Sequence, residues 1–133
     1  MLVIGLCGGS KAARLDVADQ IFYAGCGRFS MFNSGVNSTE SGRLAMLREM
    51  LRGADLPWCD RGFVYVDVST ASEAALIRQA GGSIWHIQGA VSGQVAINRF
   101  DLMVTPMQQG DRHFRPVLEA LGELVIRKRQ RSA

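Results

Sequence analysis

The run FVYVDV at residues 63–68 is the stretch that decides the fold. Its β-branched and aromatic side chains are typical of strands. We therefore expect this run to form a strand at the centre of a sheet, with Asp67 near the carboxyl end of the strand.

Elements of alternating type are expected on both sides of this strand. Upstream, the sequence predicts a strand, a helix, a short strand and a helix at residues 2–6, 11–24, 29–32 and 39–52. Downstream, it predicts a helix, two strands and a final helix at residues 70–80, 83–88, 101–105 and 114–125. Short apolar runs indicate the strands, and apolar residues at helical spacing indicate the helices.

Two of these helices begin with a capping-box pattern, in which a polar side chain and a glutamate three residues later satisfy the first N–H groups. The pairs are Asn37 with Glu40 and Thr70 with Glu73. The last helix carries Pro116 in its first turn, where proline is tolerated. The order of elements predicts an α/β three-layer sandwich with a mainly parallel sheet.

Length and composition predict one soluble domain over residues 1–133. The chain has 47% hydrophobic and 20% charged residues, which is ordinary for a folded protein. No apolar run is long enough for a membrane span, and the first residues lack the basic start of a signal peptide. Three cysteines, Cys7, Cys26 and Cys59, lie far apart, which suits a reducing compartment. We therefore expect a cytoplasmic protein that does not bind membranes.

The net charge of +3 comes from the C-terminal tail. Four of the fifteen basic residues lie within residues 127–133, and the remaining eleven face twelve acidic residues. The charge therefore gives no sign of a nucleic-acid-binding face. We interpret residues 127–133 as a frayed, solvated end, and the alternative is a contact with nucleic acid or an acidic partner.

The glycine-rich turn after the first strand is the usual phosphate site of a parallel sheet. A P-loop has glycine, four residues and then Gly-Lys-Ser or Gly-Lys-Thr. This sequence fails in both registers, because the closing triplet is Ala13-Arg14-Leu15 or Ser10-Lys11-Ala12. Two interpretations stay open: a turn without a ligand, or a weak anion or nucleotide site formed by Gly8, Gly9, Ser10, Lys11 and Arg14.

Three stretches, residues 5–19, 66–87 and 101–105, resemble one family. The first carries Val17-Ala18-Asp19 after the glycine-rich loop, and the second runs from Val66 through Glu73 and Ala74 to Gly81-Gly82. Together they resemble the deoxynucleoside monophosphate kinases encoded by many bacteriophages, which belong to the P-loop kinase superfamily. The resemblance implies a P-loop kinase-like fold.

The chain departs from this family at the residues that carry the chemistry. Ser69 stands where the family signature has arginine, Thr70-Ala71-Ser72 replace Phe-Pro-Asn, and Arg14 stands at the lysine position of the loop. The region from Phe29 to Gly62, in which the family builds its monophosphate site and much of its lid, is short. Phosphoryl transfer depends on positioning and charge stabilisation, so these departures argue against catalysis.

Several polar residues have two interpretations. Asp67 is either an acid that meets magnesium or substrate, or a turn carboxylate. Glu73 is interpreted as a capping partner of Thr70, and Cys7 as a small packed residue rather than a nucleophile. His86 and His113 lack metal-ligand spacing, so no metal site is expected.

Two functional hypotheses follow. The first is a catalytically impaired, phage-derived kinase-like protein that binds or regulates a host or phage protein, with Trp58 and Phe32 in the contacting loops. The second is a minimal kinase that transfers the γ-phosphate of ATP to a deoxynucleoside monophosphate. It would use Lys11, Arg14 and Asp67, with weakly bound ATP and magnesium. The broken loop favours the first hypothesis.

Overall fold

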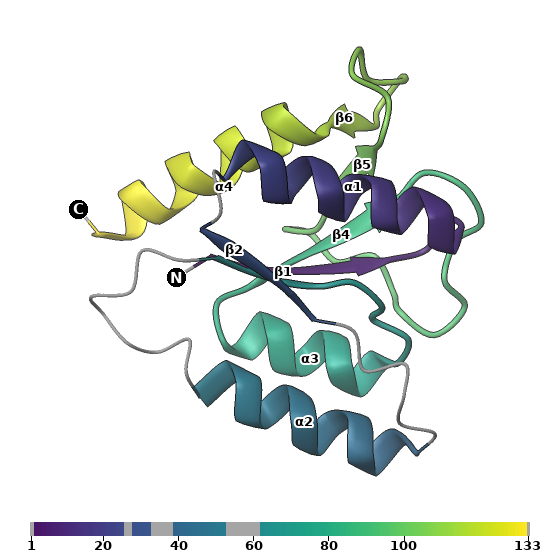
Figure 1. Ribbon diagram of the computed structural model, residues 1–133, viewed down its shortest axis with the longest axis vertical. Helices are drawn as coiled ribbons and strands as arrows, with labels where there is room; N and C mark the ends of the chain where they lie inside the picture. The colour runs from purple at the N-terminus through teal and green to yellow at the C-terminus, as the bar shows by residue number, and fades with distance from the viewer. Residues whose placement is uncertain (1, 26–27, 33–38, 53–61, 133) are drawn as a thin grey trace.

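Six strands form one parallel sheet in a computed structural model that describes residues 2–25, 28–32, 39–52 and 62–132 (Figure 1). The strands are β1 (Leu2–Cys7), β2 (Phe29–Phe32), β3 (Gly62–Tyr65), β4 (Ser83–Ile87), β5 (Leu102–Thr105) and β6 (Arg115–Pro116). Their order across the sheet is β2-β3-β1-β4-β5-β6, and every neighbouring pair is parallel.

Two helical layers cover the sheet, so the predicted three-layer α/β fold is confirmed. The helices are α1 (Lys11–Ala24), α2 (Glu40–Arg52), α3 (Ala71–Gln79) and α4 (Val117–Ser132). One face packs against α1 and α4 through residues such as Ile21 and Leu124, and the other packs against α2 and α3 through residues such as Leu47 and Ile77. A parallel sheet buried on both faces explains the near-continuous apolar strands.

Short polar caps set the helix starts. The Ser10 hydroxyl accepts a hydrogen bond from the Ala13 N–H at 3.0 Å and begins α1. Thr70 caps α3 in the same way through the Glu73 N–H. At α2 the Thr39 hydroxyl accepts from the Gly42 N–H at 3.1 Å, so Thr39 has the capping contact expected of Asn37. Asn37 itself lies outside the described residues.

Three predicted boundaries differ from the structure. The strand expected over residues 63–68 ends at Tyr65, because its neighbour β2 ends at the paired residue Phe32. Pro116 lies in β6, immediately before α4, and not in the first turn of that helix. The segment expected to be frayed continues α4 to Ser132.

The C-terminal segment is also held by side-chain contacts. Arg127 donates from Nη1 to the Phe100 carbonyl at 2.9 Å and from Nε to Glu123 at 3.1 Å. The interpretation of residues 127–133 as a solvated end is therefore wrong for Arg127. Within the described residues, no helix is long and apolar enough to cross a membrane.

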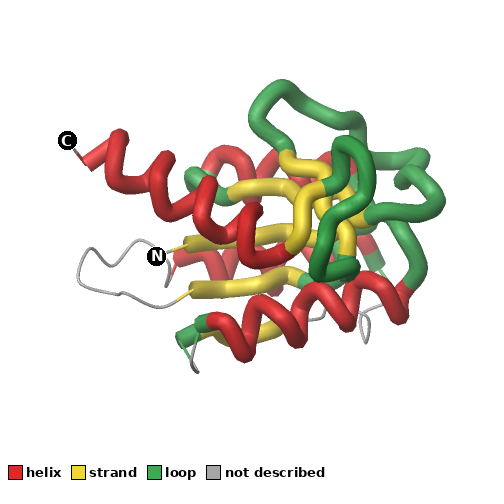
Figure 2. The backbone as a smooth tube through the Cα atoms, turned by 90° about the horizontal axis from the view of Figure 1, so that it is seen from above, coloured by secondary structure: helices red, strands yellow, loops and turns green. Residues whose placement is uncertain are grey.

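The topology places two loops beside each other at the carboxyl edge of the sheet. β1 lies between β3 and β4, and the chain crosses from β3 over β1 to reach β4. Figure 2 shows the loops gathered at one side of the strands. Ligands of open α/β sheets bind where the strand order changes direction in this way, so a site is expected at this edge.

Candidate functional site

The loop after β1 turns two carbonyl groups toward a cation. Gly8 and Gly9 have φ angles of 72° and 62°, a left-handed conformation that glycine adopts readily. Their carbonyl oxygens accept hydrogen bonds from Nη1 of Arg14 at 2.9 and 3.0 Å. The Gly9 N–H donates away from this position, to the Ala90 carbonyl at 2.8 Å.

This geometry differs from that of a phosphate cradle. A phosphate loop directs several backbone N–H groups at the anion, whereas here a guanidinium bridges two carbonyls. The Ser10 hydroxyl, which could have faced a phosphate, caps α1. Lys11 is exposed at the start of that helix. The structure therefore brings Gly8, Gly9, Ser10 and Arg14 together as a self-contained turn.

Asp67 lies between two arginines at the same edge. Its carboxylate oxygens are 3.8 Å from Nη2 of Arg14 and 3.9 Å from Nη2 of Arg43. The Ser69 hydroxyl donates to Asp67 at 3.0 Å. The side chain of Asp67 is 33% exposed, so it is the accessible member of this cluster. The described residues contain no group of three or more acids, histidines or cysteines that could hold a metal.

Arg43 joins this cluster to a buried carboxylate. Its Nη2 donates to Glu73 at 3.3 Å and to the Asp67 carbonyl and the Ser69 hydroxyl at 2.9 Å. Burial works against the charge of Arg43, but the charge of Glu73 and the hydrogen bond to it outweigh burial and raise the pKa of Arg43. Arg43 therefore stays charged at any physiological pH.

Glu73 is fully buried and has more partners than a capping residue needs. It accepts from the Tyr65 hydroxyl, the Thr70 hydroxyl at 3.1 Å and the Ser69 N–H at 3.3 Å. The interpretation of Glu73 as the capping partner of Thr70 is consistent with these contacts, but it missed the ion pair with Arg43. No local pattern signals that pair, because Arg43 lies 30 positions earlier in the chain.

A second series of hydrogen-bonded side chains begins at the last residue of β1 and continues across β4. Cys7 Sγ lies 3.2 Å from Nδ1 of His86, whose Nε2 lies 2.8 Å from Asp101. Asp101 in turn accepts from Nη2 of Arg78 at 2.6 Å. The sequence offered no histidine near Cys7, but Cys7 and His86 are paired across β1 and β4.

The burial of Cys7 indicates a structural role for its thiol and not a nucleophilic one. Cys7 is 1% exposed. Desolvation, followed by the charge of Asp101, raises the pKa of the Cys7 thiol to about 12. A nucleophilic cysteine needs an accessible thiolate, so the packing interpretation of Cys7 fits this environment.

Asp101, which accepts hydrogen bonds in the same series of side chains, is ionised. Burial alone would raise its pKa, but hydrogen bonds from His86, Arg78 and the Asn98 N–H outweigh that effect and lower the pKa of Asp101. The carboxylate is thus held by donors from β4, from α3 and from the loop before β5.

Two further predicted residues, His113 and Phe32, make aromatic contacts. His113 packs against Phe114, with ring centroids 4.6 Å apart. Phe32 is partly buried and packs against Phe63 and Tyr65, with centroids 6.0 and 5.6 Å away. Trp58 lies outside the described residues.

Comparison with known proteins gives no match for the chain among family models, curated proteins or solved structures.

Proposed function

We propose that this chain is a non-catalytic nucleotide-kinase-like protein, of bacteriophage descent, that acts as a binding or regulatory module on a protein partner. The supporting observation is the position of Arg14, whose guanidinium bridges the carbonyls of Gly8 and Gly9 at 2.9 and 3.0 Å. The loop that would hold a nucleotide phosphate is filled by a side chain of the same protein.

Displacing Arg14 would have a large cost. Hydrogen bonds that involve a charged group contribute about 1.5–3 kcal/mol each, and Arg14 forms two of them. Asp67, 3.8 Å away, adds an attraction that a phosphate would have to replace. A phosphate would also meet two carbonyl oxygens, which repel it. The site therefore favours the ligand-free turn over an anion.

The acidic residue required for magnesium is also engaged. Asp67 lies close to Arg14 and to Arg43, and two nearby cations lower the affinity of a carboxylate for a metal ion. Magnesium prefers several oxygen ligands, and the neighbours of Asp67 include one hydroxyl, that of Ser69. These contacts support a fold kept for binding rather than for phosphoryl transfer.

A nucleotide titration tests the proposal. Calorimetry with millimolar ATP and magnesium, with and without each deoxynucleoside monophosphate, should show no saturable binding, and no ADP should form. A control series with Arg14→Ala asks whether emptying the loop restores binding. Turnover by the unmodified chain would overturn the proposal.

The partner is tested with matched variants. A host or phage protein that binds the full chain should lose affinity for Phe32→Ser or Trp58→Ala. It should retain affinity for Arg48→Gln, an exposed change on α2. Equal binding by all variants would exclude these two aromatic residues as the contact.

A minimal deoxynucleoside monophosphate kinase is the second candidate, and one observation favours it. Lys11 is exposed in the first turn of α1, three residues before Arg14, which lies 3.8 Å from Asp67. In that case Lys11→Ala and Asp67→Asn should each abolish turnover, whereas Arg48→Gln should leave it unchanged.

A further inference from the structure

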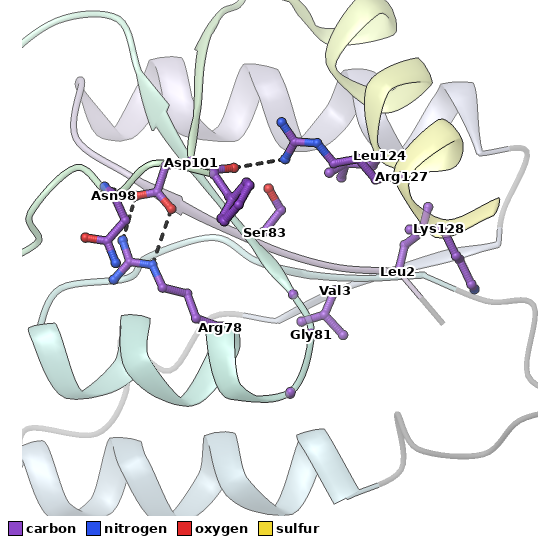
Figure 3. Close-up of a pocket in the computed structure, with 13 residues that line it drawn as sticks. Leu2, Val3, Arg78, Gly81, Ser83, Asn98, Asp101, Leu124, Arg127 and Lys128 are labelled. Carbon is purple, nitrogen blue, oxygen red and sulfur yellow. Dashed lines mark hydrogen bonds and ion pairs between the residues drawn. The ribbon is translucent and has the colours of Figure 1, made fainter. Parts of the chain in front are cut away.

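A cavity of about 350 Å³ opens at the amino edge of the sheet, opposite the loop of residues 8–10 (Figure 3). Leu2 and Val3 at the start of β1, Ser83 at the start of β4 and the turn at Gly81-Gly82 line it. Its volume is near the lower end of the range of small-molecule sites, about 300–1,000 Å³. The cavity shares no residue with the cluster of Arg14, Arg43, Asp67 and Glu73.

Cations enter this cavity from two helices. Arg78 extends from α3, and Arg127 and Lys128 extend from α4, so that Arg78 and Arg127 lie on opposite sides of Asp101 and Ser83 (Figure 3). Nη1 of Arg78 and Nη2 of Arg127 form no hydrogen bond with the described residues. Both groups can therefore donate to a ligand without losing the contacts that hold them.

Carboxylates hold both arginines of the cavity but leave part of each guanidinium unused. Asp101 already accepts hydrogen bonds from Arg78 and from the Asn98 N–H, and it pairs with His86 at 2.8 Å. Glu123, which binds Arg127 at 3.1 Å, lies outside the lining. Arg78 and Arg127 are therefore each paired with one carboxylate, and each still has an unused guanidinium N–H group for which an anion is the strongest acceptor.

A polar group at the cavity wall also lacks a partner. The Ser83 hydroxyl oxygen is buried and forms no hydrogen bond with the described residues. Nearly all buried hydroxyl groups in proteins have a partner. An oxygen of a ligand that reached the amino end of β4 would supply one.

The rest of the lining suits an apolar body. Leu2, Val3 and Leu124 supply aliphatic surface. Phe100, a residue that is 68% exposed, supplies an aromatic ring, one face of which carries the Arg99 guanidinium at 5.4 Å from the ring centroid. A large exposed aromatic side chain beside a cavity offers a surface on which a planar ligand can stack. Inorganic anions would leave this surface unused.

We propose that this cavity binds a small organic anion, an aromatic body that carries one phosphate or carboxylate. The anionic group lies between Arg78 and Arg127 and reaches toward Ser83. The aromatic body lies against Phe100 and Leu124. This site is separate from the loop at the carboxyl edge and does not depend on the function proposed for the chain.

Three probes test the proposal on the full chain: 1-naphthyl phosphate, neutral 1-naphthol and inorganic phosphate. Binding is followed by NMR shifts of the Gly81, Gly82 and Ser83 amides. We expect 1-naphthyl phosphate to bind at least about tenfold more tightly than either other probe, because only it uses both the cations and the aromatic surface. Phe100→Ala and Arg127→Gln should each weaken it by about tenfold, and Arg48→Gln should leave it unchanged.

The other outcomes overturn the proposal. Equal binding of 1-naphthol would show an apolar pocket without anion recognition, and equal binding of inorganic phosphate would show simple charge attraction. Shifts confined to residues 8–14 would place the ligand at the carboxyl edge. No saturable binding, in variants whose spectra show an intact fold, would exclude the site.

Discussion

Single residues with unusual surroundings determine how the edges of this sheet are built. Arg14 binds the loop that it follows, and Glu73 is a fully buried acid that is stabilised by Arg43, Tyr65 and Thr70. Charged groups in such positions hold a structure strongly once paired and cost much when a partner is removed.

Replacing Arg14 with methionine keeps the length of the side chain and removes both hydrogen bonds to the loop. We expect the free energy of unfolding to fall by at least about 3 kcal/mol while unfolding stays cooperative, because the apolar core is untouched. Urea denaturation measures this, with the exposed Arg48→Met as control. An unchanged stability would show that the loop does not depend on Arg14.

Gly5 faces the helix α3 across a very short distance. A Cβ there would lie 2.7 Å from Cδ1 of Ile77 and 2.8 Å from Cγ2 of Val68. Gly5→Ala should therefore destabilise the protein by about 1–3 kcal/mol through overpacking. The added change Ile77→Val, which removes that Cδ1, should restore part of the loss.

Gly122 is the matched comparison, because nothing lies within 4 Å of its added Cβ. It lies inside α4, where glycine costs about 0.5–1 kcal/mol relative to alanine. Gly122→Ala should raise the melting temperature while Gly5→Ala lowers it. The opposite order would mean that the packing of β1 against α3 is looser than described.

At the scale of elements, side-chain hydrogen bonds to one carboxylate join a strand, a helix and a loop. His86 on β4 and Arg78 on α3 meet at Asp101, immediately before β5. This carboxylate thus ties together a strand, a helix and the loop that crosses toward the next strand.

The acid stability of the protein should depend on Asp101. Its pKa is lowered in the folded state, so it contributes stability above its ordinary pKa of about 4, and that stability is lost as the pH falls through the folded value. Asp101→Asn should cost about 3 kcal/mol at pH 7 and much less near pH 3.

Urea unfolding at several pH values, with the exposed Asp19→Asn as control, checks this expectation. If the difference in the free energy of unfolding between wild type and Asp101→Asn stays constant with pH, then the neighbours of Asp101 do not lower its pKa in the folded state.

The sequence was informative about elements and less so about the site. Apolar runs and capping patterns placed the strands from β1 to β5 and the four helices within a few residues, apart from the end of α4, because these signals are local. The pairs Arg43 with Glu73 and Cys7 with His86 depend on strand order, since they join residues 30 and 79 positions apart. Strand order is set by tertiary packing, which no local pattern records.

At the scale of the whole molecule, the two edges of the sheet differ in charge arrangement. The carboxyl edge holds arginines paired with Asp67 and Glu73, whereas the amino edge holds a cavity at which Arg78 is paired with Asp101 and Arg127 with Glu123. The C-terminal helix contributes to the second edge, so the basic tail is part of the folded structure.

Deleting residues 127–133 should therefore change more than the net charge. The chain would lose the contacts of Arg127 with Glu123 and with the Phe100 carbonyl, which are partly exposed and together stabilise by about 1 kcal/mol. Thermal unfolding should show a small decrease with the fold retained. An unchanged melting temperature would restore the solvated-end interpretation.

Because the Cys7 thiol is buried, the rate at which it reacts reports how often the protein opens locally. A thiol that is 1% exposed, at the last residue of β1, can react with a disulfide reagent only while the loop above it has lifted. In a variant with Cys26→Ser and Cys59→Ser, Cys7 is the one remaining thiol. Its labelling rate would then measure the rate of local opening. Arg14→Met should raise the labelling rate of Cys7 more than it raises the rate of global unfolding. The reason is that the Arg14 guanidinium holds the loop by hydrogen bonds and does not contribute to the apolar core.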